Sequence, residues 1–192
     1  MELSVREFRA MNNSFRRFLQ RRFEFPRFKG MGLTGKGKRI LEIGCGSGYG
    51  ALLLRELEPA WYAGIDIMPE QIDLAIRREV PGCSFMTMDA ADLSYFADGS
   101  VDTVVVFGIL HHIPEWRKVL KESWRVLDKG GSLFLEEPDG RLISVWDMVF
   151  KWGHPVRGFT LAELEKEIIR AGFVIKKKKR LLGFGTYAAV KE

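Results

Sequence analysis

The sequence has only two cysteines, Cys45 and Cys83, and their spacing matches no metal-ligand pair. Two thiols in a chain without an export signal are more often reduced than joined, so we expect neither a disulfide nor a zinc site. No apolar run approaches the roughly 20 residues that span a bilayer, and the N-terminus alternates arginine with phenylalanine. These absences predict a cytoplasmic protein with no transmembrane segment and no bound metal.

Internal repeats and low-complexity tracts are also missing, which excludes solenoids, propellers and fibrous folds. The 192 residues can bury one substantial core but are too few for two full-sized domains. We therefore expect one domain over residues 31–192, preceded by a basic amphipathic arm over residues 1–30. Within the domain, proline and glycine cluster over residues 138–160 and predict an insertion.

From residue 39 onward, short apolar segments alternate with longer amphipathic ones. The segment 101–107 is almost continuously apolar and β-branched, as in a central parallel strand that is covered on both faces. The pattern predicts an α/β fold: a Rossmann-like, doubly wound, mostly parallel seven-stranded sheet with a C-terminal antiparallel hairpin. Strands are expected at 39–43, 61–65, 84–87, 101–107, 132–136, 173–181 and 184–191, and helices at 49–57, 69–79, 116–127, 141–150 and 161–171.

A glycine-rich turn follows the first expected strand, in the run Leu41-Glu42-Ile43-Gly44-Cys45-Gly46-Ser47-Gly48. Glycines let the backbone approach a ligand closely, and the N–H groups at the start of the next helix can bind its polar atoms. Asp66 stands at the end of the second strand, where a carboxylate can accept hydrogen bonds from both hydroxyls of a ribose. The glycine spacing alone fits a nicotinamide dinucleotide as well as S-adenosylmethionine.

With these segments the chain resembles the class I S-adenosylmethionine-dependent methyltransferases, particularly the small ones with a first motif of this kind. Further motif matches occur at Gly64–Ile67, Met88–Leu93, Val101–His112 and Arg125–Gly131, so the resemblance covers roughly residues 38–137. The resemblance implies S-adenosylmethionine as the cofactor. By that resemblance, Glu42, Gly44, Cys45 and Gly46 surround its methionine part, Asp66 binds the ribose, Ile67, Met68, Asp89 and Ala90 contact the adenine, and Phe107 completes the cofactor site.

His111 and His112 follow the fourth strand and are the candidate catalytic residues, as a general base or as substrate contacts. This region lacks the Asn/Asp-Pro-Pro-aromatic motif of many nucleic-acid amino-methyltransferases, and neither cysteine stands where a cytosine-methylating nucleophile is expected. A small-molecule or lipid-like acceptor is therefore favoured. The aromatic residues of the insertion could wall the acceptor pocket or pack in the core; they are Trp146, Phe150, Trp152, His154 and Phe159.

Positive charge is concentrated near the N-terminus, where residues 1–40 contain 11 Lys or Arg and 3 Asp or Glu. Such a segment can contact RNA or an anionic membrane surface. An RNA methyltransferase and a non-catalytic RNA- or partner-binding scaffold are therefore alternatives to the small-molecule enzyme. A nicotinamide oxidoreductase is disfavoured, because no Tyr-x-x-x-Lys pair is evident.

The arm also has an apolar stripe, because Phe8, Met11, Phe15 and Phe18 recur at three- and four-residue steps. We expect this stripe to pack as a lid over the cofactor cleft while the flanking arginines face outward. An interfacial helix that buries the stripe in lipid is the alternative. Pro26 is expected to end the helix before Arg27.

Overall fold

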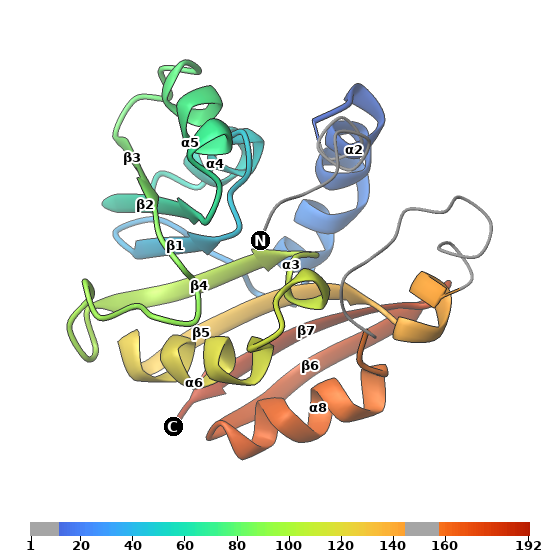
Figure 1. The fold of residues 1–192 in the computed structure, drawn as a ribbon. Coiled ribbons are helices and arrows are strands. Elements are labelled where there is room, and N and C mark those ends of the chain that lie inside the picture. Colours follow the sequence, from blue (N-terminus) through green and yellow to red (C-terminus); the bar gives the residue numbers. More distant parts are fainter. Residues whose placement is uncertain (1–11, 145–157) are drawn as a thin grey trace.

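The computed structural model describes residues 12–144 and 158–192 (Figure 1). Seven strands form one sheet in the order β3-β2-β1-β4-β5-β7-β6. The first five are parallel, while β7 is antiparallel to both β5 and β6, which confirms the predicted doubly wound sheet with its C-terminal hairpin. The strands are β1 (Arg39–Ile43), β2 (Trp61–Asp66), β3 (Cys83–Thr87), β4 (Val101–Phe107), β5 (Leu127–Pro138), β6 (Phe173–Leu181) and β7 (Phe184–Lys191).

Helices cover both faces of the sheet (Figure 1). On one face, α6 (Trp116–Val126) and α8 (Leu161–Arg170) bury their apolar sides in the larger core cluster. On the opposite face, α3 (Phe25–Met31) and α4 (Tyr49–Arg55) contribute to a second cluster with β1 and β4, and α5 (Pro69–Ile76) packs beside β3. Because apolar layers enclose the central strands on both sides, the valines of β4 are buried as predicted.

The N-terminal segment differs from the prediction at Pro26. The helix continues from α2 (Ser14–Leu19) through a π-helical segment, η1 (Gln20–Glu24), into α3, and Pro26 lies in the first turn of α3. Proline has no N–H to donate to the preceding turn, and a locally widened turn is one way for a helix to accommodate that loss. The helix ends at Gly32, which adopts a left-handed conformation with φ of 110°.

Strand β5 begins five residues earlier than the sequence pattern indicated. Leu127 pairs with Val101 and Ser132 pairs with Thr103, so the glycine-containing segment predicted as a turn forms an irregular start of the strand. Such an irregularity lets a strand begin before its regular register is established. The remainder of β5 pairs in register with β4 on one side and β7 on the other.

The described part of the 138–160 segment contains a helical stretch at residues 140–144. Trp146, Phe150, Trp152 and His154 lie outside the described residues. Phe159 is buried with its ring centroid 4.5 Å from that of Trp116, so this aromatic residue belongs to the core. Thr160 then caps α8 through the predicted capping box with Glu163.

Within residues 12–144 and 158–192, no helix is both long and apolar enough to cross a bilayer. The same residues contain no group of histidine, cysteine or acidic side chains that could hold a metal ion.

Candidate active site

The candidate site lies at the carboxyl edge of the parallel strands, where the segments after β1, β2, β3 and β4 are neighbours. Backbone hydrogen bonds tie these segments together: Cys45 N donates to Ile65 O, and Met88 N donates to Asp66 O, both at 2.9 Å. Edges of this kind are where open α/β sheets bind ligands. The topology thus brings together the residues predicted for the cofactor: Glu42, Gly44, Cys45, Gly46, Asp66, Ile67, Met68, Asp89, Ala90 and Phe107.

The glycine loop after β1 requires glycine for both conformation and packing. Gly44, Gly46 and Gly48 have φ values of 69°, 50° and 76°, in the region that disfavours other residues. A Cβ on Gly44 would lie 2.7 Å from the side chain of Ile109, and one on Gly48 would lie 2.9 Å from Ala75 Cβ. The loop is therefore held directly against the segment after β4 on one side and against α5 on the other.

Asp66 links the glycine loop to the end of β2. Its carboxylate accepts hydrogen bonds from Gly46 N and Met68 N, each at 3.0 Å. Burial raises the pKa of Asp66 above its usual value, while these N–H donors lower it. Two carboxylate oxygens offer about four acceptor sites, so hydroxyl groups of a ligand can still be bound. The neighbouring Ile67 is partly exposed and offers an apolar surface at the same edge.

Glu42 lies beneath the glycine loop and is almost fully buried. Its carboxylate accepts a hydrogen bond of 2.5 Å from the hydroxyl of Tyr62, and a Cβ on Gly50 would overlap its oxygens. Burial raises the pKa of Glu42 to about 8. The thiol of Cys45 is also buried, and burial holds its pKa well above the usual range, so the thiol has the character of a packing group.

Asp89 lies after β3 and is exposed. Its carboxylate accepts a hydrogen bond of 2.8 Å from Ala91 N, which orders the turn that carries Ala90. The adjacent Ala90 is buried. An exposed carboxylate beside a buried alanine suits a ligand that is polar at one edge and apolar on its face.

His111 is held by a residue that sequence reasoning missed. The histidine belongs to η2 (Leu110–His112), directly after β4, and its Nδ1 lies 2.8 Å from an oxygen of Glu137. The other oxygen of Glu137 accepts hydrogen bonds from Ile109 N at 2.9 Å and Leu110 N at 2.8 Å. Glu137 is fully buried, which raises its pKa to about 8. The signal in the sequence that could have identified Glu137 is an acidic residue at the mostly apolar end of β5.

His112 occupies a different environment from its neighbour. Its side chain is buried, and its ring centroid lies 4.1 Å from that of His111. The structure therefore distinguishes the two candidate catalytic histidines: Glu137 orients His111, whereas His112 packs behind it. Orientation by a buried carboxylate is typical of a histidine that acts as a general base.

Gln71 on α5 was also missed. Its side chain is 1% exposed, and neither its amide nitrogen nor its amide oxygen has a hydrogen-bond partner among the described residues. The amide oxygen lies 3.9 Å from the position of a Cβ on Gly46, so it faces the glycine loop. A buried amide without a partner costs roughly 1–3 kcal/mol, and a polar ligand group in the loop would offset that cost. The signal in the sequence that could have identified Gln71 is a polar amide on the buried side of a predicted helix.

The N-terminal arm reaches the site through Arg16. Its guanidinium donates to Phe107 O at 3.2 Å and makes two contacts with Glu24, at 2.5 and 3.0 Å. Helix α2 therefore crosses the end of β4, near the predicted cleft. The expected orientation is wrong, however, because Phe15 is 65% exposed and Phe18 is 53% exposed. Phe8 and Met11 lie outside the described residues.

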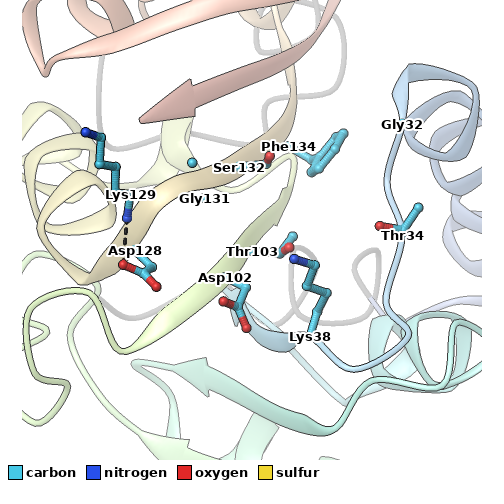
Figure 2. Close-up of a pocket in the computed structure, with 11 residues that line it drawn as sticks. Gly32, Thr34, Lys38, Asp102, Thr103, Asp128, Lys129, Gly131, Ser132 and Phe134 are labelled. Atoms are coloured by element: carbon cyan, nitrogen blue, oxygen red, sulfur yellow. Dashed lines mark hydrogen bonds between the residues drawn. The ribbon is translucent and has the colours of Figure 1, made fainter. Parts of the chain in front are cut away.

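A pocket of about 230 Å³ lies at the opposite, amino edge of the sheet (Figure 2). Lys38, Asp102 and Ser132 line it. The carboxylate of Asp102 is already bound by Arg39, through its backbone N–H at 2.7 Å and its guanidinium at 2.9 and 3.0 Å. These contacts fix the start of β4. Asp102 therefore has a structural role, and this pocket is separate from the candidate site at the carboxyl edge.

Residues 41–135 match the family described as a methyltransferase domain. Over 137 residues the chain is 37% identical to a phthiotriol/phenolphthiotriol dimycocerosates methyltransferase of Mycobacterium ulcerans, covering 70% of the chain and 50% of that relative. It is 41% identical over 138 residues to a fatty-acid O-methyltransferase of Mycolicibacterium smegmatis, with the same coverage. The chain thus spans about half the length of the curated relatives it matches.

Among solved structures, a similar fold occurs in the complex between the Haloferax volcanii Trm112 methyltransferase activator and a methyltransferase. The TM-score is 0.80 at 20% identity, and the match covers 98% of this chain and 99% of that chain. At this identity the likeness shows a shared fold.

Proposed function

We propose that this chain, which belongs to the class I S-adenosylmethionine-dependent methyltransferases, transfers a methyl group to the hydroxyl oxygen of a lipid-like acceptor. Its cofactor is S-adenosylmethionine, which supplies a methyl group already activated on a sulfonium. Transfer then needs chiefly an aligned nucleophile in a site that excludes water. The observation that carries the proposal is the contact between His111 and Glu137 at the carboxyl end of β4.

The residues at the strand ends fit this cofactor. Asp66 has acceptor capacity for the ribose hydroxyls, and Ile67 and Met68 provide an apolar surface for the adenine. Glu42 lies below the loop, where the cationic amino group would favour the charged form of its carboxyl, and the Gln71 amide faces the same loop. Carboxylates, an amide and apolar walls suit a cationic nucleoside. Lys and Arg are common phosphate ligands, and none of these positions is Lys or Arg.

His111 is proposed as the base that accepts the hydroxyl proton of the acceptor. With its Nδ1 held by Glu137, the proton is accepted at Nε2 while the acceptor oxygen bonds to the methyl carbon and the carbon–sulfur bond breaks. Because burial raises the pKa of Glu137 to about 8, the arrangement acts fully above that pH, where the ionised carboxylate stabilises the imidazolium that forms. A hydroxyl acceptor needs such a base, whereas a carboxylate acceptor is already a nucleophile without one.

The relatives support a lipid-like acceptor, because their names refer to a phthiotriol dimycocerosate and to a fatty acid. The test is incubation of the purified protein with methyl-labelled cofactor and three acceptors: a long-chain alcohol, the matching fatty acid and total RNA. We expect label in the alcohol, with a rate that His111→Ala lowers at least tenfold and His112→Asn changes little. Label in the fatty acid alone would agree with a lipid-like acceptor but would contradict both the hydroxyl acceptor and the role of His111 as a base. Label in RNA alone would contradict the proposal.

A further inference from the structure

Three large apolar side chains of the N-terminal helix are exposed within nine residues of one another. Phe15 and Phe18 on α2 are accompanied by Phe23 on η1, which is 46% exposed. The rings of Phe18 and Phe23 contact each other edge to face, with centroids 6.1 Å apart. Scattered exposed hydrophobics are common, but a contiguous cluster of phenylalanines is an unusual surface for a soluble helix. We call these three residues the aromatic cluster.

The contacts of Arg16 determine which side of α2 faces the protein. Its guanidinium points inward to Glu24 and to the carbonyl of Phe107 at the end of β4. The aromatic cluster belongs to the same helical segment but remains exposed. The cluster is therefore presented outward from the carboxyl edge of the sheet, the edge that carries the candidate site.

The turn between β6 and β7 lies at that same end of the molecule (Figure 1). Pro138 at the end of β5 pairs with Phe184, and Asp139 N donates to Gly183 O at 2.7 Å. Leu182 in this turn is 85% exposed, and Leu181 is also exposed. A second apolar projection thus stands at the carboxyl end of β5.

Exposed lysines accompany this turn on the sheet face that α3 covers. In the register of the hairpin, Lys177 pairs with Ala188 and Lys179 pairs with Thr186. Paired residues project to the same face, and Ala188 packs in the core cluster that includes Phe28 of α3. Lys178 alternates to the other face, where it pairs with Glu165 of α8. Lysine on an edge strand also discourages strand pairing, but that role does not require the neighbouring exposed leucines.

We propose that the aromatic cluster and the Leu181–Leu182 turn form a surface that docks on an anionic lipid bilayer, with Lys177 and Lys179 facing the lipid headgroups. Apolar side chains next to solvated cations are the combination that binds the interface of an anionic membrane. Single-stranded RNA could use the cations and stack its bases on the phenylalanines, but it would not need the exposed leucines of the β6–β7 turn. Docking at this edge turns the candidate site toward the bilayer. The inference goes beyond the proposed function and does not depend on it.

The test is cosedimentation of the full chain with vesicles of phosphatidylcholine containing one third phosphatidylglycerol, with no cofactor or acceptor present. We expect wild-type protein to bind these vesicles and to bind pure phosphatidylcholine more weakly. The triple variant Phe15→Ser, Phe18→Ser, Phe23→Ser should lower the partition coefficient at least tenfold, as should Leu181→Ser with Leu182→Ser. Lys177→Glu with Lys179→Glu should lower binding to anionic vesicles only.

The matched control is the double variant Tyr95→Ser with Ile169→Ser. Both side chains are exposed, but Tyr95 packs on Phe96, which contacts Trp61 at the start of β2, and Ile169 lies near the end of α8, before the start of β6. This variant should bind vesicles like wild type. Thermal unfolding and cofactor binding of each variant check that it is folded.

An equal loss in the control variant, or wild-type partitioning by the aromatic variant, would overturn the proposal. Two results together would assign the surface to a nucleic acid instead. The Lys177→Glu, Lys179→Glu variant would lose RNA binding, and the serine variants would bind vesicles like wild type. Failure of the proposed function is a separate result, because vesicle binding is measured without methyl transfer.

Discussion

The carboxylate of Glu137 and the imidazole of His111 lie 2.8 Å apart although 26 positions separate them in the chain. The contact exists because β4 and β5 are parallel neighbours, so the segments at their carboxyl ends meet. Because the second oxygen of Glu137 is held by two backbone N–H groups, the carboxylate cannot rotate away without losing both. His111 is therefore fixed in one orientation.

The first prediction concerns Glu137→Gln. The amide oxygen can still accept from the two backbone N–H groups, but its NH₂ would donate toward Nδ1 and place the histidine proton on Nε2. We expect kcat on a hydroxyl acceptor to fall about 100-fold while the dissociation constant for the cofactor is unchanged. Single-turnover rates and calorimetry separate the two quantities. A variant that loses cofactor affinity as much as rate would indicate a purely structural role for Glu137.

The second prediction concerns stability and pH. Burial raises the pKa of both Glu42 and Glu137 to about 8, far above the value in an unfolded chain. Between about pH 5 and pH 8 the folded state therefore binds more protons than the unfolded state, so the free energy of unfolding falls as pH rises. Each carboxyl contributes a slope of about 1 kcal/mol per pH unit within that window.

Urea unfolding of the cofactor-free protein at a series of pH values measures this slope. Glu42→Gln keeps an acceptor for the Tyr62 hydroxyl but cannot titrate, so its profile should be flatter. Stability that rises through this pH window would show that neither carboxyl is protonated in the folded protein. An unchanged slope in the variant would exclude Glu42 as a titrating group.

The third prediction concerns Gln71→Leu. Because the amide has no partner among the described residues, removing it should leave the stability of the cofactor-free protein unchanged or raise it. Cofactor affinity should fall about tenfold, the equivalent of one hydrogen bond. Ser123→Ala is the matched control, since the Ser123 hydroxyl donates to Val119 O at 2.8 Å within α6. The control should lower stability and spare cofactor affinity; a Gln71 variant that behaves like it would refute the ligand role.

The fourth prediction concerns Arg16→Ala. The substitution leaves the carboxyl of Glu24 buried without its cation, and burial already raises the pKa of Glu24. We expect the free energy of unfolding to fall by on the order of 2 kcal/mol and the cofactor to dissociate faster, because α2 is no longer fixed over β4. Arg21→Ala should have little effect on either, since the pair between Arg21 and Glu56 is solvent-exposed.

Equal cofactor dissociation rates in wild type and Arg16→Ala would exclude a lid role for α2. Deletion of residues 1–30 is a poorer test of that role. It also removes Phe25 and Phe28, which are buried in the core beneath β4 and β5, so the truncated chain would lose packing as well as the arm.

The sheet and the glycine loop could be predicted because their signals are local. Alternating apolar runs define the strands, and the order of Gly44, Gly46 and Asp66 along the chain follows from a strand, a turn, a helix and a second strand. The capping box of Thr160 and Glu163 is likewise contained within four residues. In each case the residues that interact are close in sequence or repeat with a known period.

The partners of His111 and Arg16 could not be predicted in this way. Glu137 reaches His111 only through the pairing of two strands, and Arg16 reaches Phe107 only because a helix crosses that strand end. The periodicity of the arm correctly indicated a helix with an apolar stripe, but periodicity does not say which side faces the protein. The buried pair of Arg16 and Glu24 decides that, against the hydrophobic preference of Phe15 and Phe18.

The π-helical segment at Gln20–Glu24 determines how the side chains of α2 are rotated around the helix axis relative to those of α3. At about 100° per residue, positions eight apart on an α-helix, such as Arg16 and Glu24, differ by about 80° around the axis. One extra residue in a widened turn makes that spacing equivalent to seven, which is about 20°, and the bidentate pair becomes possible. The same shift makes Phe18 and Phe23 equivalent to positions four apart. Deleting a single residue between them would therefore let the segment become a regular α-helix while the phenylalanines and Arg16 keep their alignment with the residues that follow.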